Sequence, residues 1–279
     1  MTKTFKQALL GAAATIALGS FAGPAHAGLV TFTWDPTQAG AGGVSAPITN
    51  ANNANIGDFA YASITTGGAN SGDFTESGVI LMTTFLNGIF PVASPGLNAN
   101  YGLYLTFSTT GHLNNWPGVG NPLANSYTGS INTLSYSFII DPTHNDTIHD
   151  SGSAFTLNDP TSNDVTLATG VKTNGQNSVS LDQGTPTAHA TATWVPTGTD
   201  SGFFVAPPAS KYLDFDLQAA FTNTGGVSTL SPGAPTILQI DGGGGNVDFI
   251  QAVPEPASLS IFGAALFGLG FASMRRRKS

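Results

Sequence analysis

Apolar and polar side chains alternate with a period of two residues in many stretches of the chain, and this pattern limits the fold more than any other feature. Residues 131–140 would place Leu134, Tyr136 and Phe138 on one face, and residues 188–195 would do the same for Ala190 and Trp194. Successive side chains of a β-strand point to opposite faces, so such stretches predict half-buried strands. Further stretches with this pattern are 29–34, 59–65, 79–86, 101–107, 164–169, 178–181, 212–221, 236–240 and 247–250.

Clusters of Gly, Pro, Asn, Asp and Ser separate these stretches, as in "PTQAGAGG" and "NANNANIGD". Such residues supply the backbone conformations of turns. We therefore expect "DGGGGN", residues 241–246, to form a hairpin turn. About ten short strands joined by turns predict an all-β fold, an antiparallel β-sandwich of jelly-roll type.

The N-terminal residues have the pattern of a secretory signal peptide. Lys3 and Lys6 precede the apolar run 8–22, and Ala25 and Ala27 supply the small residues that signal peptidase requires. We predict a signal peptide at residues 1–27, cleaved after Ala27.

The C-terminal residues have the pattern of a single transmembrane helix. Residues 257–274 carry no charge, and a helix of that length would cover roughly 27 Å, close to the thickness of a hydrocarbon core. A basic tail follows and would stay in the cytoplasm; it consists of Arg275, Arg276, Arg277 and Lys278. Together with the signal peptide, this arrangement predicts an exported β-domain at residues 28–252.

The residues before this helix resemble a known sorting signal. Val253-Pro254-Glu255-Pro256, followed by a short glycine-rich span and a terminal basic cluster, resembles the PEP-CTERM sorting signal of Gram-negative bacteria. The resemblance covers residues 253–279. It implies that exosortase processes the tail, that the membrane holds the precursor through the helix, and that the product reaches the cell surface or the extracellular matrix.

A second resemblance covers part of the β-domain. The segments "IGDFAYASITT", "GDFTESGVILMTTFLNG" and "NYGLYLTFSTTGHL", with Phe32-Thr33-Trp34-Asp35-Pro36, are similar to the flocculation-associated branch of PEP-CTERM proteins. This resemblance implies a secreted protein that helps cells to aggregate within exopolysaccharide. It implies no catalytic residues.

Charge and composition exclude several classes of function. Residues 28–253 carry 15 acidic residues and only two basic ones, Lys172 and Lys211, which gives a formal charge of −13. Such a chain repels phosphate backbones, so we exclude nucleic acid as a partner. The chain contains no cysteine, which excludes thiol catalysis and disulfide bonds.

No catalytic motif is present, and we therefore predict a protein that is not an enzyme and has no catalytic residues. The densest group of metal-ligand side chains is "DPTHNDTIHDSG", in which Asp141, Asp146 and Asp150 could hold Ca²⁺ through carboxylate oxygens. The alternative is an ordinary polar turn, since Asp, Asn and Pro are common turn residues. No other cofactor is expected.

Trp116, in "NNWPG", lies among polar residues and has two interpretations. It could provide a platform on which a sugar ring stacks, or it could fold over the edge of the core.

Taken as a whole, the sequence predicts a structural or adhesive matrix protein in exopolysaccharide-dependent flocculation or biofilm formation. A lectin-like carbohydrate-binding module is the alternative, and a polysaccharide-acting enzyme is a further one.

Overall fold

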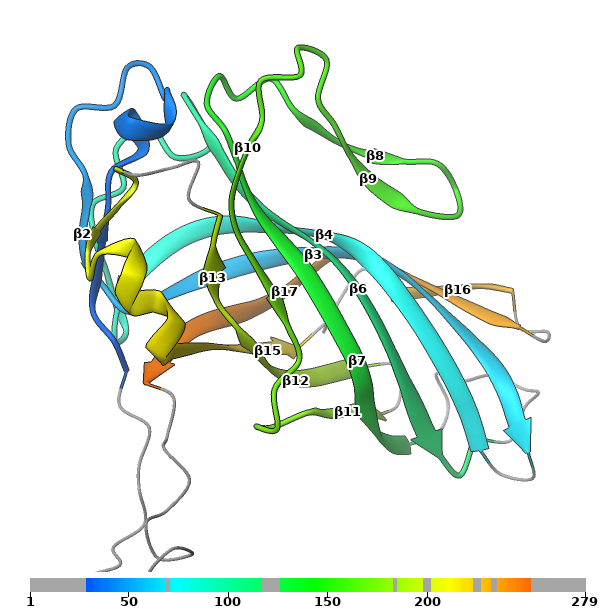
Figure 1. The fold of residues 1–279 in the computed structure, drawn as a ribbon. Coiled ribbons are helices and arrows are strands. Elements are labelled where there is room, and N and C mark those ends of the chain that lie inside the picture. Colours follow the sequence, from blue (N-terminus) through cyan, green and yellow to red (C-terminus); the bar gives the residue numbers. More distant parts are fainter. Residues whose placement is uncertain are drawn as a thin grey trace, which may run out of the picture. The chain divides into compact units, whose positions relative to one another are not determined.

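A closed β-barrel forms the main part of the protein (Figure 1). The computed structural model describes residues 29–68, 71–116, 126–182, 185–197, 202–222, 227–231 and 235–251, which lie in one compact unit. The eight barrel strands are β3 (Asn53–Gly68), β4 (Ser71–Asn87), β6 (Gly102–Asn114), β7 (Ser126–Asp141), β11 (Ser178–Asp182), β12 (Thr185–Thr193), β15 (Phe215–Thr222) and β17 (Thr236–Gln251).

The strand order closes on itself, and this corrects the predicted β-sandwich. The order is β11-β12-β15-β17-β3-β4-β6-β7, and β7 pairs again with β11 through Tyr127 and Leu181. All these pairs are antiparallel. The all-β class is confirmed, but the strands enclose one core instead of facing each other in two sheets. Alternation cannot separate the two folds, because a barrel strand and a sandwich strand both bury one face.

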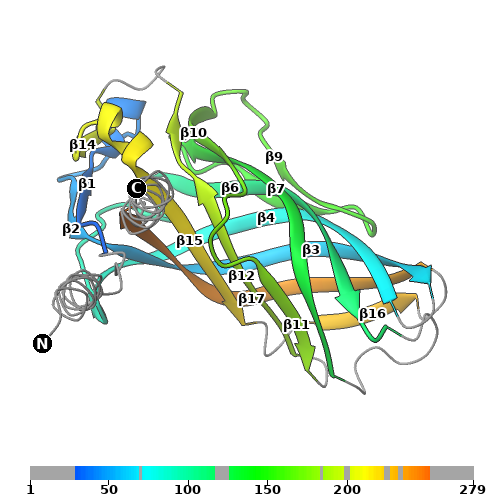
Figure 2. The same ribbon diagram turned by 60° about the horizontal axis from the view of Figure 1, so that its bottom comes forward.

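Shorter elements extend or cover the barrel. Strand β7 pairs with β11 through residues 126–130 and with β10 (Val165–Val171) through residues 135–140. Strand β13 (Val195–Pro196) pairs in turn with β10. The remaining elements are β1 (Phe32–Trp34), β2 (Ile48–Ala51), β5 (Phe90–Pro91), β8 (Thr147–Asp150), β9 (Phe155–Asn158), β14 (Phe204–Ala206), β16 (Val227–Ser231) and the 3-10 helices η1 (Pro36–Ala39) and η3 (Ala209–Asp214). Strands β14, β1 and β2 form a small sheet at one end of the barrel (Figures 1 and 2).

An aromatic cluster joins this small sheet to the barrel. Trp34 is fully buried, and its ring stacks on Phe32 and Trp194 with centroid distances of 4.2 and 6.0 Å. Its indole nitrogen donates a hydrogen bond of 2.7 Å to the hydroxyl of Tyr212. Rings of this size contribute large buried apolar areas, so the cluster ties β1 to the barrel end.

The alternation itself is confirmed in the strands. Tyr136, Phe138 and Ile140 are buried in β7, and Ala190 and Ala192 are buried in β12. Apolar residues at every second position therefore face the core, as their spacing predicts.

The predicted hairpin turn at residues 241–246 is wrong. These residues lie inside β17, which pairs with β3 and β15 along its length. The register shifts between Asp241 and Gly243, and a Cβ at Gly245 would collide with the carbonyl oxygen of Ala220. Here glycine allows an irregular strand and a close backbone approach instead of a turn.

Within the part of the chain that the structure describes, no helix has the length and apolar character needed to cross a membrane. The predicted signal peptide at 1–27 and the predicted helix at 257–274 lie outside the described residues.

Candidate metal centre

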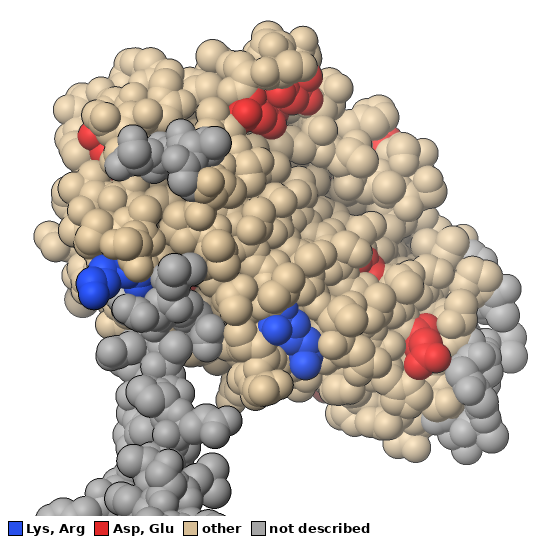
Figure 3. All heavy atoms as spheres, viewed as in Figure 1, with Lys and Arg blue, Asp and Glu red and all other residues tan. Residues whose placement is uncertain are grey.

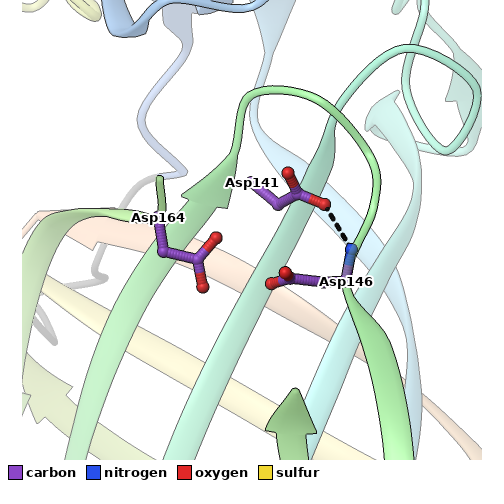
Figure 4. Close-up of side chains that lie close together, drawn as sticks. All are labelled: Asp141, Asp146 and Asp164. Atoms are coloured by element: carbon purple, nitrogen blue, oxygen red, sulfur yellow. Dashed lines mark hydrogen bonds between the residues drawn. The ribbon is translucent and has the colours of Figure 1, made fainter. Parts of the chain in front are cut away.

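Three aspartates meet where β7 ends and β10 begins. Asp141 is the last residue of β7, and Asp164 directly precedes β10. Val165 pairs with Ile140 across the two strands, so the antiparallel register brings Asp164 beside Asp141. Asp146, in the loop before β8, completes the group. One carboxylate oxygen of each residue lies within 4.8 Å of the others (Figure 4).

The Asp141 carboxylate organises the loop that follows it. Asp141 is fully buried. Its Oδ1 accepts a hydrogen bond of 2.9 Å from the backbone N–H of Thr143, and its Oδ2 accepts one of 2.9 Å from the backbone N–H of Asp146. Local bonds of this kind are typical of aspartate in turns. They hold the loop so that the Asp146 side chain points toward the group (Figure 4).

Of the other two aspartates, Asp146 is buried and Asp164 is half-buried, and both have buried oxygens without a hydrogen-bond partner. Asp146 is 8% exposed, and neither of its carboxylate oxygens has a hydrogen-bond partner. The Oδ1 atoms of Asp164 and of Asn145, in the same loop as Asp146, are also buried without a partner. Because buried polar atoms in folded proteins are nearly always satisfied, these oxygens require a partner other than the described side chains, such as water or a cation.

The electrostatics of the group point to a cation. Burial raises the pKa of Asp146 to about 6; the contact with the Asp164 carboxyl group opposes this shift, and the negative charges of Asp141 and Asp159 add to it. Burial and the adjacent Asp146 raise the pKa of Asp164 to about 8. Among the described residues, the only ion pair joins His112 and Asp73, at 2.8 Å, so no lysine or arginine compensates the three carboxylates.

These ligands match a hard divalent cation. Ca²⁺ prefers six to eight oxygen ligands at about 2.3–2.6 Å, supplied by carboxylates, amide oxygens and water. Carboxylate oxygens within 4.8 Å of each other can contact one such ion. The centre contains no His or Cys ligand, which disfavours zinc and the softer transition metals.

Two of the three aspartates predicted as ligands are in this centre, and Asp150 is not. The Asp150 carboxylate accepts hydrogen bonds from the hydroxyl of Tyr61 at 2.6 Å and from the side chain of Gln239 at 2.8 Å. It thereby connects the β8–β9 hairpin to the outside of the barrel. The third aspartate of the centre is Asp164 instead of Asp150. Only the pairing of β10 with β7 brings Asp164 to the other two, so the sequence alone could not identify it.

Trp116 occupies the core and not an open binding surface. It is 2% exposed, packs against Tyr127 with a centroid distance of 4.9 Å, and belongs to a buried cluster with Ile64 and Phe74. The faces of the ring are covered by protein, so they are not available for stacking on a sugar. The structure thus agrees with the second interpretation of this residue, in which it folds over the core.

The remaining site residues lie outside the described residues. They are Ala25 and Ala27 of the predicted cleavage site, the triplet Pro254, Glu255 and Pro256, and the basic residues Arg275, Arg276, Arg277 and Lys278.

Comparison with known proteins identifies the C-terminal segment. Residues 252–278 match the PEP-CTERM protein-sorting motif, which confirms the resemblance seen in the sequence. The protein is therefore exported, and exosortase processes it at the membrane. No curated protein and no solved structure matches the chain.

Proposed function

We propose that the chain is a non-enzymatic matrix or cell-surface protein whose β-barrel binds Ca²⁺ at Asp141, Asp146 and Asp164. The observation that carries the metal site is the buried Asp146 carboxylate, both of whose oxygens lack a hydrogen-bond partner. A bound cation would satisfy these oxygens and remove the repulsion between the carboxylates. It would also connect the loop before β8 to the start of β10.

An extracellular location supports the choice of calcium. Extracellular calcium modules bind with dissociation constants of about 10⁻⁴–10⁻³ M, and the sorting motif marks this chain for export. A site of this affinity would be filled outside the cell and release its ion to a chelator.

Asp146→Asn should abolish calcium-dependent stabilisation. We expect Ca²⁺ at 100 times its dissociation constant to stabilise the wild-type full-length chain by about 2.7 kcal/mol. The Asn variant should show no such gain, because it loses a charged ligand. Thermal unfolding with and without Ca²⁺, together with isothermal titration calorimetry, measures both effects.

Asp150→Asn is the matched control, since it removes a carboxylate from the same segment but outside the centre. It should keep the calcium response. A wild-type protein that Ca²⁺ does not stabilise, or an Asp146→Asn variant with an unchanged response, would refute the site.

The matrix role rests on the sorting motif and on the acidity of the exported region. Residues 28–253 have a formal charge of −13. On the face in Figure 3, acidic and basic side chains form small separate patches within a largely uncharged surface. A surface of this kind suits contact with hydrated polysaccharide, with divalent cations bridging carboxylates to anionic polymer.

Deletion of the gene should slow the sedimentation of cell flocs, and a calcium chelator should have the same effect on wild-type cells. The gene for the Asp146→Asn variant should fail to restore sedimentation in calcium-containing medium, whereas the Asp150→Asn gene should restore it. Floc sedimentation that is the same with and without the gene would contradict the matrix role and leave the metal site intact.

A further inference from the structure

A second candidate site lies inside the barrel and is separate from the aspartate centre. A cavity of about 110 Å³ is lined mainly by apolar side chains of the barrel strands. Its lining includes Ile64 and Leu238 from one core cluster and Leu105 and Leu217 from the other. The cavity therefore lies where the two parts of the core meet.

Two carboxyl groups interrupt this apolar lining. Asp58 of β3 and Glu76 of β4 both line the cavity, and Asp58 is 3% exposed. The strand register pairs Glu76 with Ala62, so the two acids lie on neighbouring strands and are offset by four residues along the sheet. Tyr136 is the one other titratable residue among those that line the cavity.

The Glu76 carboxyl is placed to bind something that the protein does not supply. It makes no hydrogen bond to any residue that the structure describes, and the half-buried Glu76 lines the cavity. No lysine, arginine or histidine lines the cavity. Burial of a carboxyl group such as that of Glu76 in an apolar space without a partner costs free energy. A hydrophobic side chain at position 76 would avoid that cost, so a purely structural core does not explain the glutamate.

The size and chemistry of the cavity define its ligand. An apolar protein cavity of about 150 Å³ can hold benzene, so a cavity of about 110 Å³ has room for a slightly smaller molecule. The apolar walls favour a short hydrocarbon chain, while the acids favour a group that is positively charged and donates hydrogen bonds. A primary ammonium group has three donors and one charge.

We propose that the barrel interior binds a small primary alkylamine, with its ammonium group at the Glu76 carboxyl group and its hydrocarbon chain against the apolar wall. Binding of the ammonium group favours the ionised form of the Glu76 carboxyl group, and the resulting charge pair selects the amine over neutral molecules of the same shape. The site is independent of Ca²⁺, so its test can be done in the presence of a chelator.

The test compares n-butylamine with 1-butanol on the full-length wild-type chain in chelator. We expect n-butylamine to raise the melting temperature and to bind at least tenfold more tightly than 1-butanol in calorimetric titration. Equal effects of the two compounds would overturn the proposal, because the acids would then play no part in selection. The absence of binding by either compound would overturn it too.

Variants locate the site. Glu76→Gln keeps the size of the side chain and removes its ability to ionise, so it should weaken n-butylamine binding at least tenfold and leave 1-butanol unaffected. Asp73→Asn changes an exposed acid of the same strand and should change neither. An unchanged amine affinity in Glu76→Gln would place the ligand elsewhere and refute the proposal. If that variant does not fold, the wild-type comparison of amine with alcohol still decides the question.

Discussion

Trp34→Ala is expected to lower the free energy of unfolding by about 3–5 kcal/mol, the range found when a large aromatic side chain is removed from a core. Trp34 is fully buried. Its ring contacts Phe32 and Trp194 face to face and Phe249 edge to face, with a centroid distance of 5.4 Å to Phe249. The substitution would leave a cavity between the small sheet and the barrel end and would remove the hydrogen bond to Tyr212.

Urea denaturation of the wild type and the variant measures this loss. Phe90→Ala is the control, because Phe90 is 71% exposed on the short strand β5, and changes at exposed positions usually shift stability by less than about 0.5 kcal/mol. Similar small losses in both variants would show that the aromatic cluster does not hold β1 on the barrel.

Glu76→Gln is expected to remove a large part of the pH dependence of stability. Burial, followed by the negative charge of Asp58, raises the pKa of Glu76 from 4.5 to about 8 in the folded protein. Between these two pH values the folded state binds more protons at this residue than the unfolded state does. The free energy of unfolding therefore falls as the pH rises from about 4.5 to about 8.

The size of this effect follows from the pKa shift. Each pKa unit corresponds to about 1.4 kcal/mol, so the wild type should lose on the order of 4 kcal/mol across the window relative to Glu76→Gln. Asp146 and Asp164 also have raised pKa values, and they contribute a loss of the same sign to both proteins. The difference between the two proteins reports Glu76 together with its interaction with Asp58.

Urea denaturation in chelator at several pH values between 5 and 9 measures this difference. Asp241→Asn is the control, since Asp241 is exposed and the stability profile of this variant should follow that of the wild type. If the profiles of wild type and Glu76→Gln run parallel, Glu76 is not buried as an acid in the barrel.

The local sequence predicted the regular strands correctly but did not predict the irregular strand at residues 241–246. The strands around Phe138 and Ala190 follow directly from alternation, because the two faces of a strand are set by neighbouring residues. The glycine run at 241–246 was mistaken for a turn, because flexible residues permit both a turn and an irregular strand. Only the pairing of β17 with β3 and β15 decided between these outcomes.

The candidate sites also combine residues that lie close together in the sequence with residues that only the fold brings together. Asp141 and Asp146 are five residues apart, so a ligand-rich loop could be recognised in the sequence. Asp164 joins them only because β10 pairs with β7, and Asp58 and Glu76 share a cavity only because the barrel closes around them. None of these three residues has a distinctive sequence context.

By itself, the sequence determined the all-β class, the alternating strands and the C-terminal sorting motif, because each of these is encoded in adjacent residues. The tertiary structure alone decided that the strands form a barrel, that Asp164 and not Asp150 completes the aspartate centre, and that two acids face the interior. The physical reason is that these features depend on hydrogen bonds between strands far apart in the chain, above all the pairing of β7 with β11 and β10.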